Sequence, residues 1–166
     1  ENSDGAYKSK FDYLIKKQLN HLINEINRSK KIDDKLIGCA AIILGGLSFN
    51  EKLKYLDYGL SLLKRIIRFT FDVEGFPKSR NIRQLNFYLR YFILIREWLK
   101  ESQNEIPDYL DEIIFLLGQA YSLINKDLNA SYFFNGNTNS DNLDLDNYLK
   151  RFGYTFKNES FEVGGY

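Results

Sequence analysis

The fold of this 166-residue chain is decided by the stretch LDYGLSLLKRIIRFTFDVEGFPKSRNIRQLNFYLRYFILIREWL, Leu56 to Leu99. On both sides of a short loop, apolar residues recur three or four positions apart, which places them on one face of an α-helix. Two helices joined by a short loop are expected to pack as an antiparallel hairpin. The predicted apolar faces are Leu53, Leu56, Leu60, Leu63 and Ile67 before the loop, and Leu85, Leu89, Phe92, Ile95 and Leu99 after it.

The same helical spacing recurs in the rest of the chain. The segment from Leu36 to Phe49 is apolar nearly all round, so we expect a helix that is buried on most sides and capped by Asp33 or Asp34. Its glycines permit neighbouring helices to approach closely, at some cost in helix propensity. No repeat of the kind that marks helical solenoids is visible. The other predicted helices are Phe11–Ile26, Asn81–Ser102, one from Pro107 to Ile124 and a short one over Leu143–Phe152.

The period changes near the end of the chain. The segment from Asn135 to Asp141 is rich in Asn, Asp and Ser, which predicts a loop. After Gly153, aromatic and aliphatic residues alternate with polar ones, which is typical of a strand. The fold prediction is therefore an all-α body of antiparallel helix hairpins over residues 1–152, followed by the start of a β structure over 153–166. The alternating residues are Tyr154, Phe156, Phe161 and Val163.

The composition is that of a folded domain without a large excess of either charge. Apolar residues make up 44% and charged residues 27% of the chain. With 23 basic and 22 acidic residues the formal net charge is +1, which argues against a general nucleic-acid binder. The longest apolar run, residues 36–49, is too short to span a membrane. The sequence contains no motif for a metal, a phosphate or another cofactor.

Single residues of the reactive types carry little chemistry here. Cys39 is the one cysteine and lies inside the apolar run, so we expect a small buried hydrophobe. His21 is the one histidine and lies off the apolar face of its helix, so we expect it to be exposed. The chain has no Met and begins at Glu1, and we therefore expect a processed chain or a fragment.

The loop FDVEGFPKSRN, Phe71 to Asn81, carries the most specific pattern. Glu74-Gly75 is followed by Ser79-Arg80-Asn81, and the later stretches Phe133–Gly136 and Gly165-Tyr166 come in the same order downstream. In this order and spacing the chain resembles the heparinase II/III-like family of polysaccharide lyases. In that family a helix leads into an acidic-glycine loop that ends in Arg-Ser or Arg-Asn.

The resemblance covers most of the chain and implies an incomplete (α/α) toroid followed by an antiparallel β-sandwich. Residues 1–152 would then be the last part of the toroid, and residues 153–166 would be the start of a truncated sandwich. The resemblance thus implies that the helical part packs against the remainder of its own chain, the β-sandwich domain. Lyases of this family cleave uronic-acid polysaccharides by β-elimination, so an acidic polysaccharide is the implied ligand. The relatives are bacterial, and both periplasm and cytoplasm stay open as compartments.

The residues that carry out elimination in such relatives are largely absent. The reaction needs a group that neutralises the uronate carboxylate, a base and an acid. The family's Asn-His pair falls at Asp34-Lys35, the loop position that is often His is Pro77, and the expected Tyr falls near Gln84. Tyr88, one helical turn further, is the remaining catalytic candidate. The sandwich His would lie beyond the sequence, so the segment itself is expected to be inactive.

Four residues are candidates for substrate binding, namely Arg80, Asn81, Lys78 and Asn135. Each has a structural alternative. Arg80 offers a planar donor fork that suits a carboxylate, but it can instead pair with Asp72 or Glu74 and fix the loop. Asn81 is better placed as a helix N-cap than as a sugar ligand.

Other residues also have both a functional and a structural interpretation. Asn135 with Gly136 can form a turn. Tyr88 lies among aromatic residues that indicate ordinary packing, and Trp98 can close the core or stack on a sugar. A basic wall near the loop is an alternative to an ordinary solvated helix face. Its members would be Lys64, Arg65, Arg68, Lys78 and Arg83.

Two functions follow from these observations. The first is a segment of a heparinase II/III-like protein whose cleft binds glycan, and the second is a non-enzymatic helical scaffold that binds a partner or a glycan. The first predicts a concave surface toward which Arg80 and its neighbours converge. The second predicts an exposed apolar surface.

Overall fold

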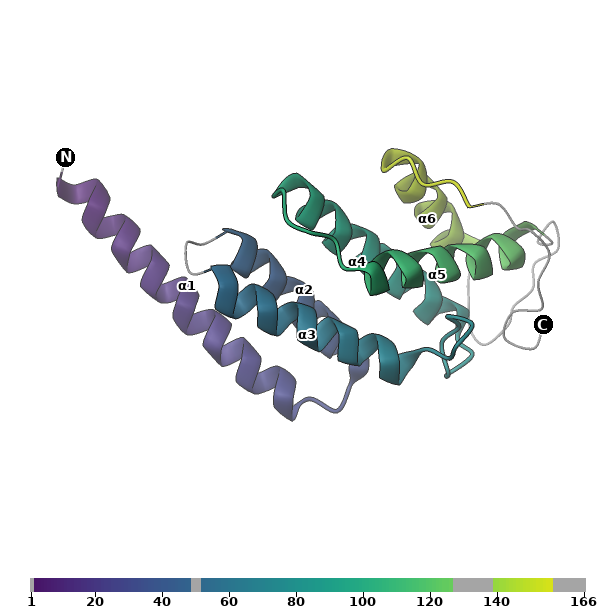
Figure 1. The fold of residues 1–166 in the computed structure, drawn as a ribbon, viewed down its shortest axis with the longest axis horizontal. Coiled ribbons are helices and arrows are strands. Elements are labelled where there is room, and N and C mark those ends of the chain that lie inside the picture. Colours follow the sequence, from purple (N-terminus) through teal and green to yellow (C-terminus); the bar gives the residue numbers. More distant parts are fainter. Residues whose placement is uncertain (1, 49–51, 127–138, 157–166) are drawn as a thin grey trace. The chain divides into compact units, whose positions relative to one another are not determined.

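In the described part of the chain, residues 2–48, 52–126 and 139–156 of a computed structural model, every regular element is helical (Figure 1). The prediction of an all-α body is confirmed. Two residues outside the helices, Phe71 and Pro77, form an isolated antiparallel bridge. The helices are α1 (Asn2–Arg28), α2 (Ile32–Ser48), α3 (Lys52–Thr70), α4 (Ile82–Glu101), α5 (Asp108–Lys126) and α6 (Asn139–Arg151).

The chain divides into two compact units, residues 1–66 and residues 67–166. The first contains α1, α2 and most of α3. The second contains the last turn of α3, the loop that follows it, and α4, α5 and α6. Each unit has its own buried apolar residues, and each is described by itself below.

Glycines set the helix packing in the first unit. Gly38 and Gly45 of α2 lie against Ile26 and Leu19 of α1, and a Cβ at either position would clash with those side chains. The contacts run in opposite sequence directions, so α1 and α2 are antiparallel. Gly46 lies in the same way against the backbone of Leu56 in α3. The expectation that these glycines permit close helix approach is confirmed.

Cys39 lies in this packed region. Its side chain is fully buried and its thiol donates a hydrogen bond to the carbonyl of Gly59, with 3.2 Å between sulfur and oxygen. Burial raises the pKa of the thiol to about 12, although the charge of Arg65 acts in the opposite direction. Cys39 is therefore the buried hydrophobe that the sequence predicts.

The N-terminal half of α1 departs from the prediction. Leu19 and Ile26 are buried, but Phe11 and Leu14, which belong to the same predicted apolar face, are 47% and 46% exposed. The reason is length, because α1 has 27 residues whereas α2 has 17. Figure 1 shows the first turns of α1 extending beyond the ends of α2 and α3. The early part of the predicted apolar face is therefore open.

Helix α4 forms the centre of the second unit. It packs against both α5 and α6. The five residues predicted to point inward from α4 are all fully buried, so this apolar face is confirmed. They are Leu85, Leu89, Phe92, Ile95 and Leu99.

Two predictions at the end of the chain need correction. Helix α6 begins at Asn139, inside the segment predicted as a loop, because Asn, Ser and Asp are favourable at the start of a helix as well as in turns. No strand forms over Tyr154–Phe156, the described part of the predicted β segment. Its alternation has another cause, since Phe156 lies against Gly118 of α5 and the hydroxyl of Tyr154 reaches α4. Phe161 and Val163 lie outside the described residues.

Candidate functional site

The loop between α3 and α4 is a compact frame built around Asp72. The Asp72 backbone N–H donates to the carbonyl of Phe76 at 3.0 Å, and its carboxylate accepts from the N–H groups of Glu74 and Phe76 at 3.1 and 2.8 Å. Gly75 allows the turn because its φ is +76°, a region that residues with a side chain rarely adopt. It also lies so close to Leu116 of α5 that a Cβ would clash. The loop is thus fixed from within and from α5.

Arg80 closes this frame. Its Nη1 lies 3.2 Å from Oδ2 of Asp72, and its guanidinium carbon lies 5.5 Å from the centre of the Phe76 ring. The prediction that Arg80 pairs with a carboxylate of the loop is confirmed, and the carboxylate is that of Asp72. The Arg80 side chain is 44% exposed, whereas that of Asp72 is 23% exposed. Solvent therefore reaches mainly the arginine.

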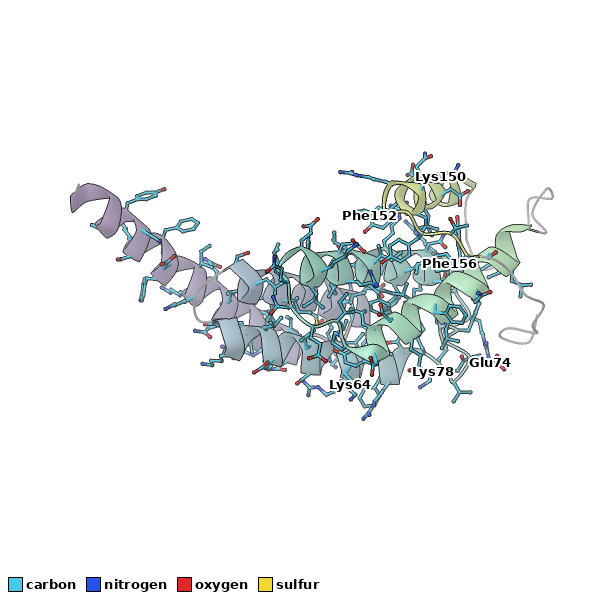
Figure 2. The ribbon with its side chains drawn as sticks, turned by 45° about the horizontal axis from the view of Figure 1, so that its top comes forward. Lys64, Glu74, Lys78, Lys150, Phe152 and Phe156 are labelled. Carbon is cyan, nitrogen blue, oxygen red and sulfur yellow. The ribbon has the colours of Figure 1, made fainter. Side chains whose placement is uncertain are left out.

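Lys78 and Asn81 hold the ends of the flanking helices. The Lys78 ammonium donates to the carbonyls of Arg68 and Phe69 at 3.2 Å each, which satisfies two groups at the end of α3. The side-chain oxygen of Asn81 accepts from the N–H of Arg83 at 2.9 Å, so the N-cap interpretation is confirmed. Figure 2 shows Lys78 and Glu74 at this loop. Substrate binding by Arg80, Asn81 and Lys78 stays a prediction, and Asn135 lies outside the described residues.

Tyr88 lies under the loop in an aromatic cluster. Its side chain is fully buried, and its ring meets those of Phe71 and Phe87 edge-on at 5.1 and 5.7 Å between centres. This arrangement is the ordinary packing that the neighbouring aromatic residues indicate. A proton carrier must reach the substrate, and the geometry of Tyr88 gives that role no support.

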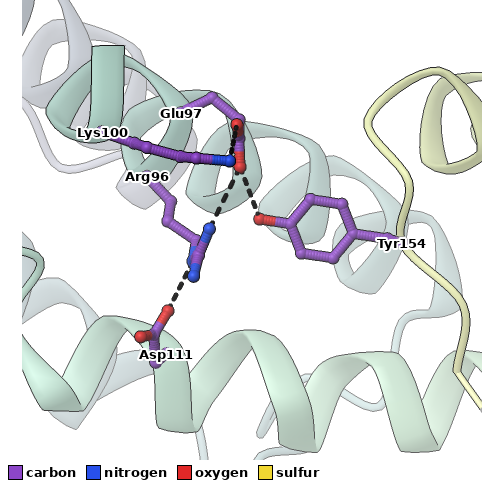
Figure 3. A network of polar contacts seen from close by, with 5 residues as sticks. All are labelled: Arg96, Glu97, Lys100, Asp111 and Tyr154. Carbon is purple, nitrogen blue, oxygen red and sulfur yellow. Dashed lines mark hydrogen bonds and ion pairs between the residues drawn. The ribbon is translucent and has the colours of Figure 1, made fainter. Parts of the chain in front are cut away.

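A second polar cluster, which we call the Arg96 network, joins α4, α5 and the segment after α6 (Figure 3). The Nε of Arg96 donates to Asp111 at 2.5 Å, and its Nη1 lies 3.2 Å from Oε1 of Glu97. The same Glu97 oxygen accepts from the hydroxyl of Tyr154 at 2.9 Å, and the ammonium of Lys100 lies 3.8 Å from the other oxygen. Glu97 thus accepts two hydrogen bonds and has an ion pair with Lys100, while Asp111 is paired with Arg96.

Burial differs sharply within the Arg96 network. The side chain of Glu97 is 13% exposed and that of Arg96 is 25% exposed, whereas that of Asp111 is 51% exposed. The hydrogen bond to Asp111 is the main reason why the pKa of Arg96 is raised, so its charge is permanent. Burial, followed by the hydrogen bond to Glu97, raises the pKa of Tyr154. The phenol is therefore held in its neutral form, as the donor to Glu97.

The Arg96 network forms one wall of an open hollow of about 400 Å³. Apolar and aromatic side chains form the rest of its lining, and Phe115 is 58% exposed. Figure 2 shows Phe152 and Phe156 at the end of α6 and on the segment that follows it. The hollow therefore combines charged side chains with aromatic ones. Its apolar lining consists of Ile114, Phe115, Phe152 and Phe156, with Gly153 between them.

Further contacts fix the elements that carry the Arg96 network. The hydroxyl of Tyr148 on α6 donates to the carbonyl of Arg90 on α4 at 3.0 Å, and the hydroxyl of Tyr121 donates to Asp146 at 2.8 Å. Ser122 of α5 donates to the carbonyl of Phe156 at 3.2 Å. These bonds tie α6 and residues 154–156 to α4 and α5, so the hollow has a stable frame.

The sequence did not single out the Arg96 network, because its members are spread over three elements and as many as 58 residues. One signal was available. Arg96-Glu97 interrupts the apolar run of α4, where an ion pair is unexpected unless it has partners. Neither Trp98 nor His21 is among the residues that line the hollow; Trp98 is partly buried, and His21 on α1 is exposed, as predicted.

No group of three or more His, Cys, Asp or Glu residues suited to a metal ion is present among the described residues. None of the described helices combines the length and the apolar character that a membrane span requires. The chain matches no family model, no curated protein and no solved structure with which it was compared.

Proposed function

We propose that this chain is a helical segment of a heparinase II/III-like protein and that its second unit binds acidic glycans without cleaving them. The motif order from Leu56 to Leu99, with Glu74-Gly75 and Ser79-Arg80-Asn81 in the loop, supports the family. The all-helical body is compatible with the incomplete toroid that the family implies. The β-sandwich that the family implies falls outside the described residues and is part of the same proposal.

The observation that carries the proposal is the hollow beside Arg96. A guanidinium held by two carboxylates is a donor that is already oriented for a further carboxylate, and Lys100 adds a second positive charge. The rings of Phe115 and Phe152 suit the apolar C–H faces of a sugar, because an aromatic face carries partial negative charge. Charge and ring faces together favour a uronate-containing glycan over a neutral sugar or a purely apolar ligand.

Binding is favoured over cleavage by the state of Tyr154. Elimination needs a base that removes the proton next to the uronate carboxylate. Tyr154 is a phenol that lines the hollow beside Arg96, but its pKa is raised and its hydroxyl already donates to Glu97. The positions that match the family's Asn-His pair and loop His hold Asp34-Lys35 and Pro77. We therefore expect no unsaturated uronate product from this chain.

A pair of matched ligands tests this function. The amide and side-chain NMR signals of the chain should be titrated with a uronate tetrasaccharide and with the same tetrasaccharide after reduction of its carboxyl groups. The proposal expects binding of the acidic form, with shifts at Arg96, Lys100 and Phe115, and at least tenfold weaker binding of the neutral form, since hydrogen bonds to charged groups contribute about 1.5–3 kcal/mol. Equal binding of both forms, or shifts elsewhere, would contradict it.

The scaffold function is a second candidate, and the first turns of α1 favour it. Tyr7, Phe11, Tyr13 and Leu14 are between 46% and 72% exposed, which is unusual for so many large apolar residues within two helical turns. An apolar surface of this kind fits a protein partner better than a glycan. Replacing Phe11 and Leu14 by Gln should abolish partner capture while leaving glycan binding by the second unit unchanged.

A further inference from the structure

The two carboxylates that hold Arg96 are not equivalent. Glu97 is largely buried and receives a hydrogen bond from Tyr154 as well as the charges of Arg96 and Lys100. Asp111 is half exposed, lies in the first turn of α5 and has its ion pair with Arg96. Water can solvate the Asp111 carboxylate if it leaves Arg96, whereas Glu97 would lose two hydrogen bonds and an ion pair in a poorly solvated place.

We propose that Asp111 is a specificity-determining residue that occupies the place of a ligand carboxylate. This inference rests on the proposed glycan-binding function and names the group that a ligand must displace. An incoming carboxylate takes the Nε edge of Arg96, and Asp111 turns out to solvent. Glu97 and Tyr154 keep the guanidinium in place during this exchange.

The exchange explains how the hollow selects for charge. A neutral sugar cannot replace Asp111, because it offers no carboxylate to the guanidinium and would leave Glu97, which Lys100 also contacts, as the remaining counterion of Arg96. A carboxylate makes the same interaction that Asp111 makes, and the displaced Asp111 regains water. The site therefore rejects neutral glycans by means of a residue of its own, in addition to attracting acidic ones.

Removal of the competing charge is the direct test. In Asp111→Asn the side chain keeps its size but loses its charge, so the affinity for the uronate tetrasaccharide should rise by about two- to fivefold, the range expected for a half-exposed ion pair. Asp108→Asn is the matched control, because Asp108 is an exposed acid in the same first turn of α5 and the net charge changes equally. The affinity of Asp108→Asn for the tetrasaccharide should change by less than the affinity of Asp111→Asn does.

The outcomes separate this inference from the function on which it rests. If the unmodified chain binds the acidic tetrasaccharide and Asp111→Asn binds it equally or more weakly, the competitor role of Asp111 is overturned and the glycan function stands. A similar gain in both Asn variants also overturns it, since the effect is then one of net charge. If neither the unmodified chain nor Asp111→Asn binds, both proposals fall. Binding by the Asn variant alone supports both.

Discussion

Arg80 and Arg96 each pair with an aspartate and each lie over an aromatic ring, yet the more exposed member of the pair differs. In the loop, Asp72 is the fixed member, because its carboxylate also accepts two backbone N–H groups, and Arg80 is the more exposed. In the Arg96 network, the arginine is fixed and Asp111 is the more exposed. In the first pair the arginine side chain can leave its partner for solvent, whereas in the second pair the aspartate side chain can do so. Under the proposed function, the second pair is the one that leaves a positioned guanidinium for a ligand.

The largest effect should come from the frame around Asp72. Gly75→Ala requires a side chain at φ +76° and places a Cβ against the Cβ of Leu116, which cannot move without its helix. We expect the free energy of unfolding of the second unit to fall by about 3 kcal/mol, as measured by urea titration with Trp98 fluorescence.

Gly153→Ala provides the control for that experiment. Gly153 has nearly the same φ, +73°, but nothing lies within 4 Å of its Cβ position. Gly153→Ala should therefore lower the free energy of unfolding by about 1 kcal/mol, the cost of holding a residue with a side chain in the left-handed region. Equal losses in the two variants would mean that the contact with Leu116 is not tight, and the loop would then be a less rigid frame than described.

The next effect distinguishes the two members of the loop pair. Asp72→Ala leaves the N–H groups of Glu74 and Phe76 without their acceptor and should cost about 2 kcal/mol. Arg80→Ala removes a half-exposed ion pair and should cost at most about 1 kcal/mol. The same urea titration measures both. A larger loss for the arginine variant would make Arg80 the structural brace and would reverse this half of the comparison.

In the Arg96 network the order should be opposite. Arg96→Ala leaves the buried Glu97 with less compensation and removes packing over Tyr154, for a cost of about 1–2 kcal/mol. Asp111→Ala should cost less than about 1 kcal/mol, because its carboxylate is half exposed. If the aspartate variant is the less stable of the two, Asp111 is a structural anchor and cannot serve as the exchangeable partner.

The smallest effect concerns the frame of α6 and depends on pH. Burial is the main reason why the pKa of Tyr148 is raised to about 12 from an ordinary value of about 10. The stability that comes from keeping this phenol neutral is present below pH 10 and lost as the pH rises toward 12. Tyr148→Phe lacks the hydrogen bond to Arg90 at neutral pH, but it also lacks this titration. The stability difference between the two proteins should therefore narrow above pH 10; a constant difference would show that Tyr148 titrates normally.

The sequence predicted the helices, the inward face of α4 and the Arg80 pair because these depend on local spacing. The residues of the Arg80 pair are eight positions apart in one loop, and helical period alone sets the buried residues of α4. The Arg96 network could not be predicted in the same way, since Arg96, Asp111 and Tyr154 meet only after α4, α5 and the segment that follows α6 have packed. The open half of α1 was missed for a related reason, because periodicity identifies an apolar face without saying how far its partner helix extends.

The burial of Cys39 determines how fast its thiol can react. It is the one thiol of the chain and lies in the first unit, while the one tryptophan, Trp98, lies in the second. A buried thiol with a pKa near 12 reacts with a disulfide reagent only when the helices around it separate. The rate of Cys39 modification at neutral pH therefore reports how readily α1, α2 and α3 separate. Thiol modification at Cys39 therefore reports on the first unit, and Trp98 fluorescence reports on the second, so the opening of the two units can be measured separately in one protein.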